Sequence, residues 1–178
     1  GGVSGWPAYT STISQSSVWA GNGGFSARVT PTTTGSDSFI SVGGSAAIPL
    51  NLSAGSSYTF SGTITLPVAQ TGTLDGRARG ITVYSWIGAT ASTTSQSTLA
   101  PNSVGMTRVS VTFTVPASAT GLQVRFYNGG SNIADNSVYW ESIMVASGST
   151  SYSFADGNST NWAWNGATNN SSSTGPPL

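Results

Sequence analysis

The chain has 178 residues, carries five arginines and five acidic residues, and contains no histidine, cysteine or lysine, so its formal net charge is zero. Charged residues make up 6% of the sequence, against about 25% in an ordinary soluble domain. These absences exclude serine–histidine–aspartate triads, thiol nucleophiles, zinc sites of histidine and cysteine, lysine Schiff bases and the lysine-dependent phosphate loop. Five scattered arginines cannot supply the basic surface of a nucleic-acid binder, and no apolar run is long enough to span a membrane.

A chain of this length predicts one folded domain. Its hydrophobic content is only 37%, but it includes 6 Trp, 6 Tyr and 6 Phe, which bury a large area per residue. Because there is no cysteine for a disulfide, the fold must be stabilised by this core.

Short segments in which polar and apolar residues alternate recur along the chain, separated by Gly, Pro and Asn. This pattern predicts β-strands, and no segment has the composition of a helix. In the clearest strand, Gly62 occupies one position of the apolar face, and Pro67 ends the strand because proline has no N–H to donate. In chain order, the predicted strands are Ser11–Trp19, Phe25–Thr30, Ser36–Val42, Ser57–Leu66, Gly80–Gly88, Ser95–Leu99, Arg108–Val115, Leu122–Tyr127 and Val138–Val145.

Eight or nine short strands without a helix predict an all-β fold, an antiparallel β-sandwich or jelly roll. We expect this fold to occupy residues 1–148. Residues 149–178 form a Ser-, Asn- and Gly-rich segment, which we expect to be extended, held by its aromatic side chains and frayed at its last residues. These aromatic side chains are Tyr152, Phe154, Trp162 and Trp164.

The acidic residues indicate whether the chain could hydrolyse a glycosidic bond, a reaction that needs two facing carboxyl groups. Three of the five lie in sequences typical of turns. Of the other two, one opens a predicted strand and one lies within a strand, and no pattern brings them together. The composition therefore predicts that the protein is not an enzyme. The turn residues are Asp75, Asp135 and Asp156, and the strand residues are Asp37 and Glu141.

Glu141 is the unusual carboxylate, because strict alternation places it on the apolar face with Tyr139, Ile143 and Val145. An unpaired charge is costly to bury. Two interpretations stay open: Glu141 pairs with an arginine, Arg28 or Arg108, or it is a ligand of a structural calcium ion, which prefers carboxylate and backbone oxygens.

The aromatic residues predict a binding surface. In the predicted strand Gly80–Gly88, Tyr84 and Trp86 lie on the face opposite the apolar one. In the predicted strand Leu122–Tyr127, the face opposite the apolar one carries Gln123, Arg125 and Tyr127. If these strands are neighbours in one sheet, rings, an amide and a guanidinium share its outer face. Such a surface suits a neutral sugar, whose C–H faces lie on rings while its hydroxyls bond to planar polar groups. The alternative is that a loop covers Tyr84 or Trp86 in a secondary core. The remaining tryptophans are expected to pack: Trp6, Trp19, Trp140, Trp162 and Trp164.

The order of several segments resembles the carbohydrate-binding modules of the four/nine/twenty-two superfamily over about residues 3–148. The segments are Gly5–Trp6, Ala20–Gly23, Phe25–Val29, Leu52–Gly62, Thr107–Phe113 and Tyr139–Val145. The two segments Ser151–Gly157 and Trp162–Ser171 are similar to the closing part of such modules in minor tail proteins of phages that infect actinobacteria.

This resemblance implies a jelly roll that binds a polysaccharide or cell-wall glycan on a concave sheet, with a structural calcium ion between its sheets. Glu141 falls at a position where the superfamily usually has Asp. The resemblance also implies a virion-tail or extracellular protein, recognising the host surface, with other tail proteins as further partners. The alternative is a structural or protein-interaction domain of a phage tail without a sugar ligand.

Overall fold

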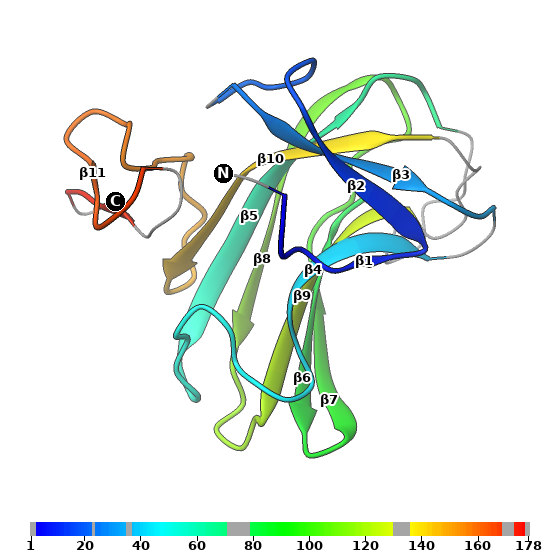
Figure 1. Ribbon diagram of the computed structural model, residues 1–178. Coiled ribbons are helices and arrows are strands. Elements are labelled where there is room, and N and C mark those ends of the chain that lie inside the picture. The colour runs from blue at the N-terminus through cyan, green and yellow to red at the C-terminus, as the bar shows by residue number, and fades with distance from the viewer. Residues whose placement is uncertain are drawn as a thin grey trace.

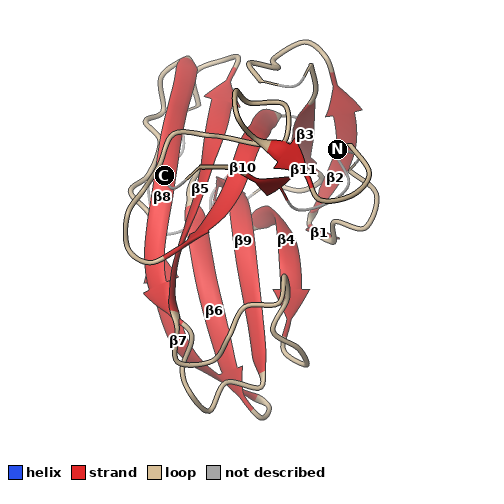
Figure 2. Ribbon diagram, turned by 90° about the vertical axis from the view of Figure 1, so that its left-hand side faces the viewer, coloured by secondary structure: helices blue, strands red, loops and turns tan. Residues whose placement is uncertain are grey.

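The computed structural model describes residues 3–22, 24–34, 37–70, 79–129, 136–168 and 173–176. This part of the chain contains strands and no helix (Figure 2). The strands are β1 (Ala8–Tyr9), β2 (Ser11–Ser16), β3 (Ser26–Pro31), β4 (Ser38–Gly44), β5 (Ser57–Leu66), β6 (Ile81–Ile87), β7 (Thr90–Gln96), β8 (Gly105–Thr114), β9 (Gly121–Gly129), β10 (Val138–Ser147), β11 (Ala163–Trp164) and β12 (Ser173–Thr174).

Ten of these strands form two five-stranded antiparallel sheets that face each other (Figure 1). Sheet A has the order β1-β4-β9-β6-β7, and sheet B has the order β2-β3-β10-β5-β8. The predicted all-β jelly-roll sandwich is therefore confirmed.

The core lies between the sheets and is built from the alternating apolar residues of their inner faces. Phe126 of β9 and Trp140 of β10 meet edge to face, with ring centroids 5.4 Å apart. Trp6, from the segment before β1, packs on Phe126 at 5.6 Å. Gly62 lies under Trp140, where a Cβ atom would approach the indole ring to 3.4 Å. The inward position predicted for Gly62 is confirmed, and its missing side chain leaves room for the tryptophan.

The predicted strand Ser95–Leu99 is replaced by β7, which starts earlier and pairs with β6 from Thr90 to Gln96. The connecting turn includes Gly88 at a φ of 61°, a conformation that glycine adopts without strain. The Thr- and Ser-rich sequence of β7 has no polar–apolar alternation, because β7 is an edge strand of sheet A. The two-residue strand β1 was not predicted either, since two residues show no period.

Strand β10 corrects the face assigned to Glu141. Its pairing with β5 shifts register between Glu141 and Met144, where Ser142 has a φ of 51°. This β-bulge inserts one extra residue, so Trp140 faces the core before it and Ile143 faces the core after it. Glu141 therefore lies on the outer face of sheet B, opposite the face that strict alternation predicted.

The C-terminal segment forms a small unit beside the sandwich, in which β11 pairs with β12 (Figure 1). Its two tryptophans lie against glycine backbone: a Cβ atom at Gly157 would overlap the ring of Trp164, and one at Gly175 would overlap the ring of Trp162. The expected packing role of these tryptophans agrees with this arrangement. The short strand pair was not predicted.

Candidate functional site

The two strands that carry the predicted site are neighbours: β6 pairs with β9 along sheet A. The sequence left this pairing open as the condition for a shared face, and the structure meets the condition. Tyr84 lies opposite Gln123 in this register, and the inward residues of both strands belong to the core. The five predicted residues therefore share the outer face of sheet A. They are Tyr84, Trp86, Gln123, Arg125 and Tyr127.

Tyr84 and Trp86 keep part of their surface accessible, and their ring centroids are 6.1 Å apart. Neither ring is enclosed in a secondary core, which was the alternative to an exposed position. The two ring planes are tilted by 40°, so each ring can offer its own apolar surface to a ligand.

Tyr127 differs from the expected exposed ring, because it is 0% exposed. The ring of Phe39 on β4 covers it at a centroid distance of 5.0 Å, and its hydroxyl lies 3.4 Å from the hydroxyl of Tyr84. Burial raises the pKa of Tyr127 well above that of a free phenol, and the hydrogen bond with Tyr84 adds to this rise. Tyr127 thus supports the outer face from beneath.

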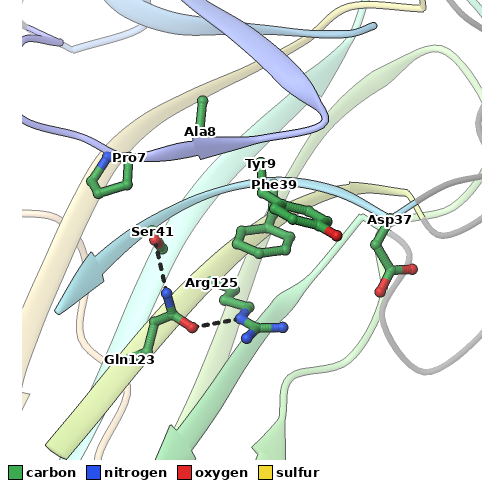
Figure 3. A pocket seen from close by; sticks show the side chains of 8 residues that line it. All are labelled: Pro7, Ala8, Tyr9, Asp37, Phe39, Ser41, Gln123 and Arg125. Carbon is green, nitrogen blue, oxygen red and sulfur yellow. Dashed lines mark hydrogen bonds between the residues drawn. The ribbon is translucent and has the colours of Figure 1, made fainter. Parts of the chain in front are cut away.

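Arg125 connects the polar groups of the face. Its Nε donates a hydrogen bond to Oε1 of Gln123 at 2.7 Å, and its Nη1 donates to the Tyr127 hydroxyl at 3.2 Å. Nε2 of Gln123 in turn donates to Oγ of Ser41 at 3.2 Å. The Gln123–Ser41 bond joins β9 to β4, and the bonds together fix the planes of the amide and the guanidinium; Figure 3 shows the two that Gln123 makes.

A hollow of about 460 Å³ extends this face toward β1 and β4 (Figure 3). Tyr9 stands at its side with 56% of its surface exposed, stacked on Phe39 with centroids 5.1 Å apart and ring planes 20° apart. The lining residues are Pro7, Ala8, Tyr9, Asp37, Phe39, Ser41, Gln123 and Arg125.

Tyr9, Asp37, Phe39 and Ser41 were not among the predicted site residues. The alternation in β4 does carry a signal for two of them, because Ile40 faces the core and its neighbours Phe39 and Ser41 must face outward. Tyr9 has no comparable signal.

The carboxylates of the described residues are dispersed. Asp37 lines the hollow on sheet A, whereas Glu141 lies on sheet B. Asp156 accepts hydrogen bonds from the Asn158 amide at 2.9 Å and the Ser159 hydroxyl at 3.3 Å, which agrees with its predicted turn. The turns predicted at Asp75 and Asp135 lie outside the described residues.

Glu141 is 4% exposed, and its Oε2 accepts hydrogen bonds from the backbone amides of Gly21 and Asn22, the second at 3.2 Å. Arg28 instead donates to Ser137, and Arg108 donates to hydroxyl and carbonyl oxygens. Peptide N–H groups therefore compensate the buried charge of Glu141. A pairing with Arg28 or Arg108 was one of the two expectations, and neither arginine takes this place.

The same contacts bear on calcium. A calcium ion needs six to eight oxygen ligands, but the groups that approach Oε2 are N–H donors. No group of three or more acidic residues gathers within the described ranges. The Gly21–Asn22 loop thus binds the Glu141 carboxylate as an anion, an arrangement that differs from a calcium site. Calcium at Glu141 stays a prediction.

Trp19 departs from the packing expected of the tryptophans, since 40% of its surface is exposed. It lies in the loop between β2 and β3, two strands of sheet B, whereas the candidate face belongs to sheet A. Among the described residues, no helix is long and apolar enough to cross a membrane.

Comparison with known proteins shows relationships in structure only. No family model matches the sequence, and no curated protein sequence matches it. Solved structures do match the fold. One is a family 16 carbohydrate-binding module, with a TM-score of 0.54 and 19% identity, covering 82% of this chain and 92% of that one.

Two further matches contain family 22 modules. The tandem CBM22-1–CBM22-2 domain of Paenibacillus barcinonensis Xyn10C has a TM-score of 0.58 and 13% identity, over 93% of this chain and 51% of that one. The CBM22-1–GH10 modules of Clostridium thermocellum xylanase Xyn10B, solved with xylohexaose, have a TM-score of 0.54 and 12% identity over 85% of this chain. This chain spans only 28% of that xylanase chain. At these identities, the comparisons establish that the chain has the fold of carbohydrate-binding modules.

Proposed function

We propose that the protein is a non-catalytic carbohydrate-binding module, and that the outer face of β4, β9 and β6 binds a polysaccharide. The observation that carries the proposal is the combination of accessible rings with fixed planar polar groups on one sheet face, which includes a hollow. Tyr9, Tyr84 and Trp86 supply the rings, and Gln123 and Arg125 supply the polar groups. Sugars present apolar C–H faces and hydroxyls, which match these two kinds of surface.

The distribution of acidic groups supports binding without hydrolysis. Within the described residues that line the hollow, Asp37 is the single carboxylate, and glycoside hydrolysis ordinarily needs two. The fold shared with carbohydrate-binding modules supports sugar binding, whereas the proposed absence of hydrolysis rests on the carboxylates alone. A neutral polysaccharide is the ligand class that this mixture of rings, amide and hydroxyls favours.

The biological setting that we propose is a phage tail or a secreted protein, where the module recognises the polysaccharide of a host cell surface. The support for this setting is the sequence resemblance, including the Ser151–Gly157 and Trp162–Ser171 segments. Other tail proteins would then be further partners.

Affinity electrophoresis through gels that contain xylan, β-glucan, arabinan or bacterial wall polysaccharide tests the proposal. We expect one of these polysaccharides to retard the protein, and Trp86→Ala to lower the affinity by about tenfold or more without a change in melting temperature. Trp19→Ala is the matched control, because Trp19 is exposed outside the candidate face. Equal retardation of wild type and Trp86→Ala would exclude this face as the site.

The alternative function, a protein-interaction domain, has one observation in its favour. Val104 and Met106 expose 58% and 57% of their surface at the start of β8, away from the candidate face. Exposed apolar residues are common singly, so this support is weaker. An oligomer in light scattering, together with no response to any polysaccharide, would favour this alternative.

A further inference from the structure

Arg125 occupies a position between two aromatic rings. Its Cζ lies 4.1 Å from the ring centroid of Tyr84 on β6 and 4.5 Å from that of Phe39 on β4. The residues directly opposite Arg125 in the sheet are Ser41 and Thr82. Because both of these side chains are small, the guanidinium has room to lie over the sheet between the two diagonal rings.

The charge of Arg125 and two of its N–H donors are engaged within the protein. Contact with two ring faces is a favourable environment for a cation. Two of its nitrogens also donate to Gln123 and Tyr127. A guanidinium makes such contacts because it is planar and presents several N–H groups in a fixed arrangement, whereas an ammonium group is a compact point charge.

We propose that Arg125 is a positioning residue, whose guanidinium holds Phe39 and Tyr84 at the spacing that the glycan meets, and that glycan binding depends on this geometry rather than on its charge. The inference rests on the proposed function, and it names what determines the selectivity of that same face.

Each of the two rings beside Arg125 contacts one further ring, so the position of Arg125 affects four rings on this face. Phe39 carries Tyr9 as a stacked outer ring, and Tyr84 contacts Trp86 on the other side. Arg125 therefore separates two ring pairs, Tyr9–Phe39 and Tyr84–Trp86. If its planar group were lost, the two pairs would no longer be held apart by a rigid spacer.

The charges around the hollow also argue against an acidic glycan. Asp37 lines the same hollow as Arg125, so a negatively charged sugar there would approach a carboxylate as well as the guanidinium. An anion site would instead be expected to collect several unopposed cationic donors.

The test compares Arg125→Lys, which keeps the charge but not the plane, with wild type. Near-ultraviolet circular dichroism reports the packing of the aromatic side chains, Tyr84, Trp86 and Phe39 among them, and far-ultraviolet circular dichroism reports the sheets. For a positioning residue, we expect Arg125→Lys to change the near-ultraviolet spectrum and leave the far-ultraviolet spectrum unchanged. The matched control is Arg28→Lys, because Arg28 is exposed on the other sheet. An unchanged near-ultraviolet spectrum in Arg125→Lys would overturn the inference.

Binding is measured by calorimetry with a polysaccharide that retards the wild type in affinity gels. We expect Arg125→Lys to weaken binding by about tenfold, and wild-type affinity to stay unchanged as sodium chloride is raised, since screening weakens only charge contacts. Full affinity in Arg125→Lys, or affinity that falls steeply with salt, would overturn the inference. If the wild type binds none of the polysaccharides, the proposed function fails, and the circular dichroism comparison still decides whether Arg125 holds the rings.

Discussion

The outer faces of the two sheets differ in what covers them: the outer face of sheet B packs against other parts of the chain, whereas the outer face of sheet A keeps aromatic rings accessible. On sheet B, the hydroxyls of β5 and β8 bond to each other, as in the pair Thr59–Thr112 at 2.9 Å, and Thr59 and Ser61 are buried. The start of the chain's own C-terminal segment lies on this face, since Thr112 of β8 donates to the carbonyl of Ser149 at 3.4 Å and Arg108 donates to that of Tyr152. On sheet A, the rings of Tyr9, Tyr84 and Trp86 keep accessible surface.

The two half-buried arginines of these faces make the contrast plain. Arg108 on sheet B donates to the Ser61 hydroxyl at 2.6 Å and to the carbonyls of Ser142 and Tyr152 at 3.2 and 3.3 Å. Arg125 on sheet A lies between two rings. Arg108 therefore fastens parts of the chain to each other, whereas Arg125 organises a face that the chain leaves open.

Removing the Arg108 side chain should have the largest effect on stability. In Arg108→Met, the carbonyls of Ser142 and Tyr152 lose a charged donor, and we expect the free energy of unfolding to fall by about 3 kcal/mol. Glycan affinity should stay at the wild-type value, because sheet A is unchanged. Chemical denaturation and calorimetry measure the two quantities, with Arg28→Met as control, since Arg28 is exposed and makes one side-chain bond to Ser137. A loss of affinity in Arg108→Met would mean that the two faces are coupled.

The buried carboxylate of sheet B gives the next largest effect. In Glu141→Gln, the amides of Gly21 and Asn22 keep an oxygen acceptor but lose the charge that strengthens both bonds, so we expect a loss of about 1–2 kcal/mol in unfolding free energy. Gly21→Ala should have a similar cost, because its Cβ would lie 2.7 Å from Oε1 of Glu141.

The effect of calcium on the melting temperature tests whether Glu141 binds a metal ion. If peptide N–H groups compensate Glu141, added calcium or a chelator should leave the melting temperature of the wild type unchanged. A melting temperature that rises with calcium in wild type and not in Glu141→Gln would contradict this, and would support the metal that the sequence resemblance implies.

These residues also show how far the sequence could lead. The outward direction of Tyr84, Trp86, Gln123 and Arg125 followed from the alternation in two segments, whereas the sequence left open whether those strands, β6 and β9, are neighbours. The burial of Tyr127 did not, because the ring that covers it, Phe39, comes from a strand distant in sequence.

The position of Glu141 escaped prediction for a different reason. A β-bulge changes the phase of a strand, and here the residue with positive φ is Ser142, which has no glycine-like signature. Tyr9 escaped because β1 has only two residues. Local period thus predicts which residues share a face, while non-local cover and irregular backbone determine which of them a ligand can reach.

Alkaline pH should reveal the buried phenol of Tyr127. Burial raises the folded-state pKa of Tyr127 above the value of about 10 in an unfolded chain. Its contribution to stability is therefore complete below pH 10, and it is lost as the pH rises from there through the folded-state pKa. Absorbance titration of tyrosinate should show, in the difference between wild type and Tyr127→Phe, a phenol that ionises well above pH 10. Above pH 10, Tyr127→Phe should lose stability less steeply than wild type.

The smallest effect is expected for the Tyr84 hydroxyl. Its oxygen lies 3.4 Å from that of Tyr127, a long hydrogen bond whose removal in Tyr84→Phe should cost at most about 0.5 kcal/mol. The ring stays in place, so its contact with Arg125 at 4.1 Å is retained, and calorimetry should give an affinity within about twofold of wild type. A loss of about tenfold or more would mean that the hydroxyl itself bonds to the glycan. Tyr84 would then recognise the sugar through its polar group, and the division between rings that form the platform and planar groups that bond to hydroxyls would have to be redrawn for this face.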